Sequence, residues 1–422
     1  MKSPSRLAVL WVVILFGVCT VLGAGCIKKE KDKESTRKKP DASARAISAG
    51  TTALKASQDD CVGPIVRSGK PKQLTLNDVK YTKSGYLLTQ TSSDPDEEIV
   101  VGIVSDTKEN TEENRKNLDL IMDFFEKEKV DIIIHLGDVA SLLPMPEEID
   151  VPEKDKDGIP LTEADKERFK RRVTNKARRE AMARSLENIV EMISILADSD
   201  LPVFVIIGNR ECKTTFNSAM ATLAEDYPNV FNLNAIRRVD LDDLDIISMP
   251  GYHDPEYVHC SWDKCLYYES DTLSIIKLAR EANDPVLLVS HGPPRQKDRN
   301  GIDVVSEGAN VGNPWLTSAI EKAGIAFGAF GNIQEAGGKA TSLDGTSIIS
   351  QDKFVNSFFL NPGPADSMIW SMNDGTESQG MAAVIHFVGS KAKYKILRLG
   401  SEAKTAPVPE PETAPEKKEE TP

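Results

Sequence analysis

The sequence IVVGIVSDTK at positions 99–108 joins a near-continuous apolar run to a group of polar side chains. An apolar run of this length, without alternation, predicts a strand that is buried on both faces, as in the parallel sheets of α/β proteins. Segment 117–127 then places its apolar residues on one helical face, and segment 130–136 is again apolar and β-branched. The order of strand, helix and strand therefore predicts an α/β domain.

Other apolar runs along the chain also end in short polar islands. Because the carboxyl ends of parallel strands meet at one edge of a sheet, where ligands usually bind, we expect these islands to converge. With the first, they are Ser105-Asp106-Thr107-Lys108, Gly137-Asp138-Val139, Gly208-Asn209-Arg210-Glu211, Ser290-His291-Gly292-Pro293 and Gly331-Asn332-Ile333-Gln334.

In order and type, the five islands resemble the metal-binding motifs of the calcineurin-like metallophosphoesterases, which read D-x-H, G-D, G-N-H-[D/E], H and G-H-x-H. The resemblance spans about residues 97–398 and implies an α/β fold: a four-layer α/β/β/α sandwich with two central mixed sheets. The chain departs from the pattern at four positions where the family has histidine. These positions hold Lys108, Arg210, Asn332 and Gln334.

The resemblance implies that the first metal of the family would be held at positions 106, 108, 138 and 334. Asp106 and Asp138 keep the family's residue type, but Lys108 and Gln334 do not. A charged lysine has donors only and offers no lone pair to a metal. We therefore predict that the first metal site is lost and that Asp106 is its remnant.

The second metal would be held by Asp138, Asn209 and His291, with Asn332 in place of a histidine. An asparagine oxygen can ligate a hard cation such as Mg, Ca or Mn, so the sequence leaves open either no metal or one divalent ion. The histidine that protonates the phosphate ester in the family corresponds to Arg210. Arginine can clamp a phosphate, but it does not give up its proton near neutral pH, so no catalytic residue is assigned.

Without a metal, the carboxylates of Asp106 and Asp138 would repel one another. One hypothesis is that Lys108 and Arg210 form internal ion pairs with them and replace the metals. The alternative is that Lys108 points to solvent and the aspartates are exposed. The basic groups could equally hold an anion, so a loss of hydrolysis would not imply a loss of binding.

The N-terminal segment has a positive start, an apolar run from Leu7 to Val21 and small residues before Cys26. It resembles a bacterial lipoprotein signal in which Cys26 is lipidated; the alternative is an uncleaved membrane anchor. Both place the domain in the cell envelope, outside the cytoplasmic membrane. The predicted division is a signal segment at 1–26, a flexible tether at 27–60, the domain at 61–400 and a disordered Pro/Glu-rich tail at 401–422.

Four cysteines remain in the domain, an even number that suits an oxidising compartment. Cys260 and Cys265 flank a four-residue loop, which favours a Cys260–Cys265 disulfide and leaves Cys61–Cys212 as the second pair. A zinc site is the alternative.

The formal net charge of −13 argues against a nucleic-acid partner. Two functions stay open. The first is a membrane-tethered lipoprotein whose domain is catalytically impaired and acts in binding or as a structural part, with a phosphate-containing ligand as a candidate partner. The second is a metal-dependent phosphoric ester hydrolase that uses the single remaining metal site.

Overall fold

The computed structural model describes residues 61–400, apart from 64, 67–68, 93–97, 143–144 and 147. The expectations for the signal segment at 1–26, for Cys26, for the tether at 27–60 and for the tail at 401–422 lie outside the described residues. Within the described part of the chain, no helix is long and apolar enough to cross a membrane.

A six-stranded mixed sheet carries the first three islands. Its order is β18-β17-β4-β5-β6-β7, in which β4 to β7 run parallel and β17 and β18 are antiparallel additions. Strand β4 leads into the first island. It contains the apolar run that the sequence predicted to be a buried strand. The bounds are Glu98–Val104 (β4), Ile132–His135 (β5), Val203–Val205 (β6), Val230–Asn232 (β7), Met381–Val388 (β17) and Lys391–Arg398 (β18).

A ten-stranded mixed sheet carries the other two islands, in the order β1-β2-β3-β8-β9-β10-β11-β14-β12-β13. Its centre, β9-β10-β11-β14, is parallel. The sequence pattern did not predict strands β1 to β3, which lie at one edge of this sheet. The bounds are Lys72–Leu76 (β1), Val79–Ser84 (β2), Leu87–Gln90 (β3), Arg238–Asp240 (β8), Asp245–Met249 (β9), Val286–Ser290 (β10), Phe327–Phe330 (β11), Lys339–Thr341 (β12), Ile348–Ile349 (β13) and Phe358–Asn361 (β14); β15 (Trp370–Ser371) and β16 (Glu377–Ser378) form a separate hairpin.

Side-chain caps determine where some of the helices begin. Thr111 accepts a hydrogen bond from the backbone N–H of Asn114, so α1 starts one turn earlier than the apolar pattern predicted. Asn313 caps α5 in the same way, and Pro314 follows it as the first residue of the helix. The bounds are Glu112–Glu128 (α1), Glu163–Ala197 (α2), Lys213–Asp226 (α3), Glu269–Glu281 (α4), Pro314–Ala323 (α5) and a 3-10 turn η2, Gln334–Ala336.

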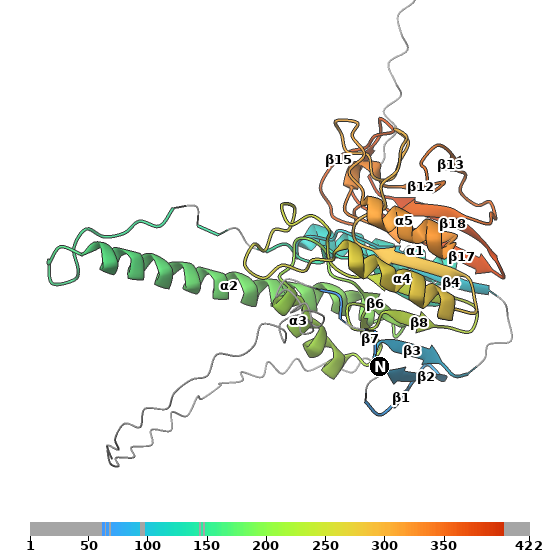
Figure 1. The fold of residues 1–422 in the computed structure, drawn as a ribbon, viewed down its shortest axis with the longest axis horizontal. Coiled ribbons are helices and arrows are strands. Elements are labelled where there is room, and N and C mark those ends of the chain that lie inside the picture. The colour runs from blue at the N-terminus through green and yellow to red at the C-terminus, as the bar shows by residue number, and fades with distance from the viewer. Residues whose placement is uncertain are drawn as a thin grey trace, which may run out of the picture. The chain divides into compact units, whose positions relative to one another are not determined.

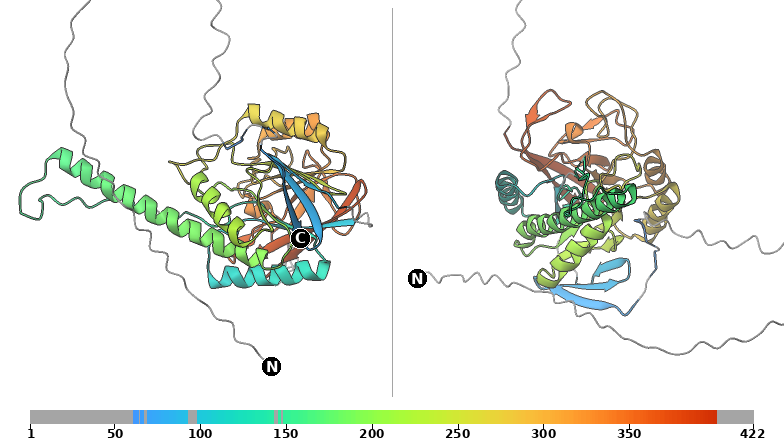
Figure 2. Two further views of the ribbon diagram at one scale, coloured as in Figure 1. Left: turned by 90° about the horizontal axis from the view of Figure 1, so that it is seen from below. Right: turned by 90° about the vertical axis from the view of Figure 1, so that its left-hand side faces the viewer.

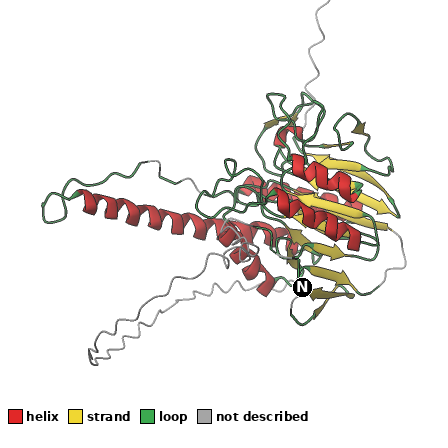
Figure 3. Ribbon diagram, viewed as in Figure 1, coloured by secondary structure: helices red, strands yellow, loops and turns green. Residues whose placement is uncertain are grey.

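The two sheets pack face to face, and helices cover both outer faces (Figures 1, 2 and 3). The central core joins Val101 and Ile134 of one sheet to Ile246 and Val289 of the other. A second core packs α1, α2 and α3 on the six-stranded sheet, and a third packs α4 and α5 on the ten-stranded sheet. The predicted α/β/β/α sandwich with two mixed sheets is therefore confirmed.

Helix α2 has two halves with different surroundings. Ile189, Ile193 and Leu196 in its second half are fully buried against the six-stranded sheet. The first half, up to about residue 180, is exposed or only partly buried and extends away from the sheets (Figure 1). The charged residues of the first half therefore meet solvent, and the apolar residues of the second half pack in the core.

The predicted disulfide pairing, Cys260–Cys265 with Cys61–Cys212, was wrong. The structure pairs Cys61 with Cys265 and Cys212 with Cys260. The backbone N–H of Cys61 donates to the carbonyl of Leu266, which brings the start of the domain beside Cys265. The backbone N–H of Lys213 donates to Asp263, which holds Cys212 next to Cys260. Both contacts join segments far apart in sequence, so local spacing was a poor guide.

Candidate functional site

The five islands do converge at one edge of the sheets, at or just after the ends of β4, β5, β6, β10 and β11. Asp106, Asp138 and Asn332 have positive φ angles of 56°, 54° and 65°, so each island turns sharply as its strand ends. A side chain at Gly208 would overlap Asp138, which explains why glycine precedes Asn209. The turns therefore aim the polar side chains into one buried centre.

Three of the predicted ligand atoms lie together in this centre. The imidazole Nε2 of His291 is 3.3 Å from Asp138 Oδ1 and 3.2 Å from Asn209 Oδ1. His291 Nδ1 lies 2.8 Å from the Leu136 carbonyl, an acceptor that requires the proton to be on Nδ1. Asn209 donates from Nδ2 to the Tyr257 carbonyl, which turns its oxygen toward His291. The cluster of His291, Asp138 and Asn209 is thus held in place by the surrounding backbone.

His291 Nε2 can carry either a proton or a metal ion, because it faces two oxygen atoms. A proton on Nε2 would be donated to these oxygens, and a metal ion would be bound by them as well. Burial disfavours the imidazolium, but the carboxylate of Asp138 outweighs burial and raises the pKa of His291 to about 9. Burial likewise opposes ionisation of Asp138, yet the charges of His291 and Arg210 hold the pKa of Asp138 below its usual range. Without a metal, the centre therefore contains an imidazolium–carboxylate pair.

Arg210 occupies the other side of Asp138. Its backbone N–H donates to Asp138 Oδ1 at 3.0 Å, and its guanidinium Nε lies 3.3 Å from Asp138 Oδ2. The Nη1 group donates to the hydroxyl of Ser141 at 3.2 Å, which fixes the direction of the guanidinium. The structure thus contains the ion pair between Arg210 and Asp138 that the hypothesis of internal cations required.

Asp106 is satisfied by hydrogen-bond donors and has no ion pair with a lysine among the described residues. Its Oδ2 accepts from the Ser105 hydroxyl at 2.6 Å and from the backbone N–H of Asn332 at 3.0 Å. Its Oδ1 accepts from the Gln334 amide at 2.6 Å. Gln334 stands where the family has a histidine that would bind the first metal together with Asp106. Here Gln334 instead donates a hydrogen bond to Asp106.

The expectation for Lys108 was wrong in both of its forms. Lys108 is 4% exposed, so it does not point to solvent, and its ammonium lies 3.2 Å from Asp366 Oδ2. The ammonium also lies 4.1 Å from the centre of the Trp370 ring, and Trp370 donates from Nε1 to Asp366 Oδ1 at 2.7 Å. Burial raises the pKa of Asp366, and the Lys108 charge only partly opposes that effect.

Asp366 and Glu211 are buried carboxylates beside the island side chains, and the sequence did not indicate their contacts. Asp366 follows the Asn361-Pro362-Gly363-Pro364 turn, and its backbone N–H donates to the Asp106 carbonyl. Glu211 is fully buried, and its carboxylate accepts from the backbone N–H groups of Val139 and Gly208. Burial and the nearby charge of Asp138 raise the pKa of Glu211 to about 8. An acidic residue after a Pro-Gly turn was the only available signal for Asp366.

The residues do not fit a metal at the first family position. Both oxygens of Asp106 already accept hydrogen bonds, Asp138 Oδ2 faces a guanidinium, and Lys108 is turned toward Asp366. The Gln334 amide and the Arg210 guanidinium thus present N–H donors to these carboxylates, where a cation needs lone pairs.

The second position fits one divalent ion through Asp138, Asn209 and His291, because their ligand atoms converge. Asp106, Asp138 and His291 also bring one ligand atom each within 4.8 Å of one another. Asn332 uses its amide nitrogen to donate to the Tyr252 hydroxyl and its backbone N–H to contact Asp106. Neither contact bears on its predicted role as a ligand.

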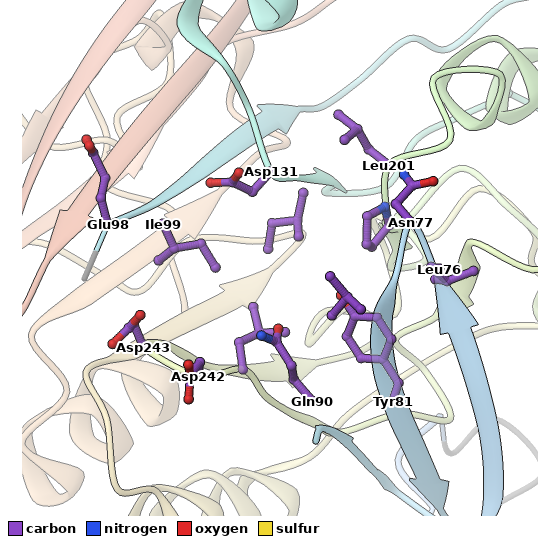
Figure 4. Close-up of a pocket in the computed structure, with 14 residues that line it drawn as sticks. Leu76, Asn77, Tyr81, Gln90, Glu98, Ile99, Asp131, Leu201, Asp242 and Asp243 are labelled. Carbon is purple, nitrogen blue, oxygen red and sulfur yellow. The ribbon is translucent and has the colours of Figure 1, made fainter. Parts of the chain in front are cut away.

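A separate cavity of 210 Å³ lies at the opposite edge of the sheets (Figure 4). It is lined by residues at the starts of β4 and β5, including Glu98 and Asp131, whereas the islands follow the ends of those strands. Strand β4 has seven residues, which separates the two edges by about 20 Å. This cavity is therefore not part of the centre.

Comparison with known proteins places these observations in a family. The profile described as calcineurin-like phosphoesterase matches residues 99–316, just over half of the chain. The chain is similar to a protein of Thermus thermophilus at 10% identity and a TM-score of 0.39, covering 67% of this chain and 94% of that one. It is also similar to a dimetal phosphatase from Danio rerio at 11% identity and a TM-score of 0.37, covering 71% and 98%. Neither structure bears on activity at these scores. No curated protein matches the chain.

Proposed function

The chain belongs to the calcineurin-like phosphoesterase family, and from that premise we propose that its domain is a catalytically impaired member with a binding or structural role in the cell envelope. The observation that carries this proposal is the guanidinium of Arg210 on Asp138, the aspartate that would bridge both metals in the family. A fixed internal cation thus competes with the metals for their shared ligand.

Electrostatics explains why Arg210 opposes metal binding. Two unit charges about 4 Å apart interact by about 4 kcal/mol at the effective dielectric of a protein site, and a divalent ion doubles the repulsion. The guanidinium cannot relieve this repulsion by losing its proton. The imidazolium of His291 adds a second positive charge on the other side of Asp138. Metal binding would have to displace the guanidinium and remove the Nε2 proton of His291.

Arg210 also removes an acid that the reaction needs. In the family, a histidine at this position protonates the leaving group of the phosphate ester, and arginine cannot replace it in that role. The guanidinium can still hold a phosphate, because its fork matches the geometry of phosphate oxygens. Binding of a phosphate-containing ligand without turnover is therefore the activity that these residues favour.

A phosphoric ester hydrolase with one metal is the second candidate, and the convergence of Asp138, Asn209 and His291 favours it. A divalent ion held there would act as a Lewis acid toward a phosphoryl oxygen. In that case Asn209 and His291 would orient the ion, and Arg210 would hold the phosphate. Mn, Mg or Ca suits this set of oxygen and imidazole donors.

Metal analysis and a hydrolysis assay of the full chain separate the two candidates. After dialysis against Mn, we expect well under about 0.2 Mn per chain and hydrolysis of bis-p-nitrophenyl phosphate no faster than that of an Asp138→Asn variant, because Arg210 and His291 already neutralise Asp138. The matched control is Asp119→Asn, which changes an exposed carboxylate on α1. One Mn per chain, with turnover lost in Asp138→Asn and kept in Asp119→Asn, would establish the hydrolase instead.

Lipidation of Cys26 and location outside the cytoplasmic membrane complete the proposal, with the membrane as the partner of the N-terminus and no nucleic-acid partner. The support is the apolar run from Leu7 to Val21 followed by small residues and a cysteine. We expect Cys26→Ser to abolish incorporation of radiolabelled palmitate and to reduce the share of the protein in the membrane fraction. Cys19→Ser, inside the apolar run, is the control and should keep the label. Equal labelling of the parent and Cys26→Ser would disprove the anchor.

A further inference from the structure

A cavity of 430 Å³ lies beside helix α2, outside the set of candidate metal ligands. One wall comes from α2, a second from the loop that contains Cys260, and a third from the segment after β5. Its volume falls within the range of about 300 to 1,000 Å³ that is usual for small-molecule sites. The lining residues are Leu142, Met145, Pro146, Ile149, Thr174, Arg178, His259, Ser261 and Trp262.

Arg178 and Trp262 stand out among the polar residues of this cavity, which also include Thr174, His259 and Ser261. The guanidinium carbon of Arg178 lies 4.7 Å from the centre of the Trp262 ring, a stacking arrangement that holds the cation in position. Arg178 Nε and Trp262 Nε1 are both buried and find no hydrogen-bond partner among the described residues. Buried N–H donors without an acceptor are uncommon in native proteins and call for a partner that the described residues do not supply.

The electrostatic surroundings favour a negatively charged partner. None of the described lining residues is an aspartate or glutamate, and within the described part of the chain no carboxylate forms an ion pair with Arg178. Segment 166–184 of α2 contains nine lysines and arginines and only two glutamates. Positive charge concentrated along this part of α2 attracts anions toward the helix, and Arg178 is the member of the group that lines the cavity.

The apolar residues determine what kind of anion would fit. Leu142, Met145 and Ile149 are partly buried and face the same cavity as the Trp262 ring. A free inorganic ion would leave this apolar wall in contact with water, whereas an organic group would cover it. The set of one cation, one indole and several aliphatic side chains suits an anion that carries an apolar or aromatic group.

The cavity adjoins the centre without sharing its ligands. Leu142 directly follows Ser141, which accepts the hydrogen bond from Arg210. The backbone N–H of His259 donates to the carbonyl of Asn209 at 2.9 Å. A ligand in the cavity would thus contact both segments that hold the centre, but none of Asp106, Asp138, Asn209 or His291 lines it.

We propose that this cavity is a binding site for a small organic anion, with its negative group on Arg178 and its apolar group against Trp262 and the aliphatic wall. The inference goes beyond the proposed function, because it holds whether or not the centre binds a metal. Phenyl phosphate is a suitable probe, since it combines both chemical features and is small enough for the cavity.

Binding can be measured on the full chain by isothermal titration calorimetry in the presence of a chelator. The chelator removes divalent ions, so the measured affinity does not depend on a metal at the centre. We expect phenyl phosphate to bind saturably and more tightly than inorganic phosphate or phenol. Arg178→Gln should weaken it at least about tenfold, because a charge-assisted hydrogen bond is lost. Trp262→Leu should weaken it as well, through loss of the stacked ring. Circular dichroism would verify that both variants fold.

The matched control is Arg179→Gln, which removes the same charge from the next, exposed residue of α2. It should change the affinity by no more than about twofold, since exposed charges contribute little. Equal losses in Arg178→Gln and Arg179→Gln would show nonspecific attraction and overturn the proposal. A loss in Arg210→Gln with none in Arg178→Gln would place the probe at the centre and overturn it too. Binding of phenyl phosphate that does not saturate up to about 10 mM would also overturn the proposal.

Discussion

Replacing Lys108 with methionine is expected to lower the free energy of unfolding by about 3 to 5 kcal/mol, because it leaves the buried carboxylate of Asp366 without its cation. Lys108 and Asp366 are 4% and 2% exposed, so water cannot take the place of the lost charge. Methionine keeps the unbranched side chain, which matters because Lys108 has a φ of 58°. Urea denaturation followed by circular dichroism gives the difference.

Two further variants make this result specific to the buried pair. Adding Asp366→Asn to Lys108→Met should recover most of the loss, because asparagine removes the charge and can still accept from Trp370 Nε1. Lys116→Met breaks an exposed pair with Glu112 and should cost less than about 1 kcal/mol. If Lys108→Met were no more costly than Lys116→Met, the Lys108–Asp366 pair could not be an important stabilising contact.

Restoring histidine at positions 108, 210, 332 and 334 should give the second large effect. We expect the combined variant to bind two Mn per chain and to hydrolyse bis-p-nitrophenyl phosphate at least about 100-fold faster than the parent. The structural reason is that Arg210 and Gln334 now contact Asp138 and Asp106, the two carboxylates that the metals need. Asp366→Asn must be included, because Lys108→His would otherwise leave Asp366 unpaired.

Subsets of these changes show which contact prevents metal binding. Arg210→His alone should permit one Mn per chain, since it frees Asp138 while Lys108 and Gln334 still prevent the first site from forming. Adding Asp138→Asn to the full set should abolish both metal binding and turnover. Should the full set fold and bind no Mn, the substitutions at the four positions would not be the cause of the impairment, and the proposed function would lose its main support.

Much of the fold could be predicted from local patterns. The buried strand at 99–104 and the apolar face of the helix after it are encoded in adjacent residues, and so are most of the later strands. The edge strands β1 to β3 were not predicted, since short amphipathic strands at the edge of a sheet have weak signals. The boundaries also differed at α1, where the capping contact of Thr111 extends the helix beyond its apolar pattern.

The residues of the candidate site could be predicted from the sequence, but most of the contacts between them could not. Sequence order identified Asp138, Asn209 and His291, because each follows a strand whose end lies at the ligand-binding edge. It also predicted a cation on Asp138, which proved to be Arg210. The partner of Lys108 could not be found in this way, since Asp366 lies 258 positions further along the chain and follows a turn rather than a motif strand.

By itself, the sequence determined the family, the two mixed sheets and the four positions at which histidine is replaced, because these depend on residue type and order. Only the tertiary structure decided which charges meet: Arg210 with Asp138, Lys108 with Asp366, Cys61 with Cys265. The physical reason is that pairing energies act over a few ångströms, and distances of that size between remote segments are set by how the sheets and loops pack. The islands therefore keep the family's order, and Arg210 contacts Asp138, the aspartate that would bridge the metals.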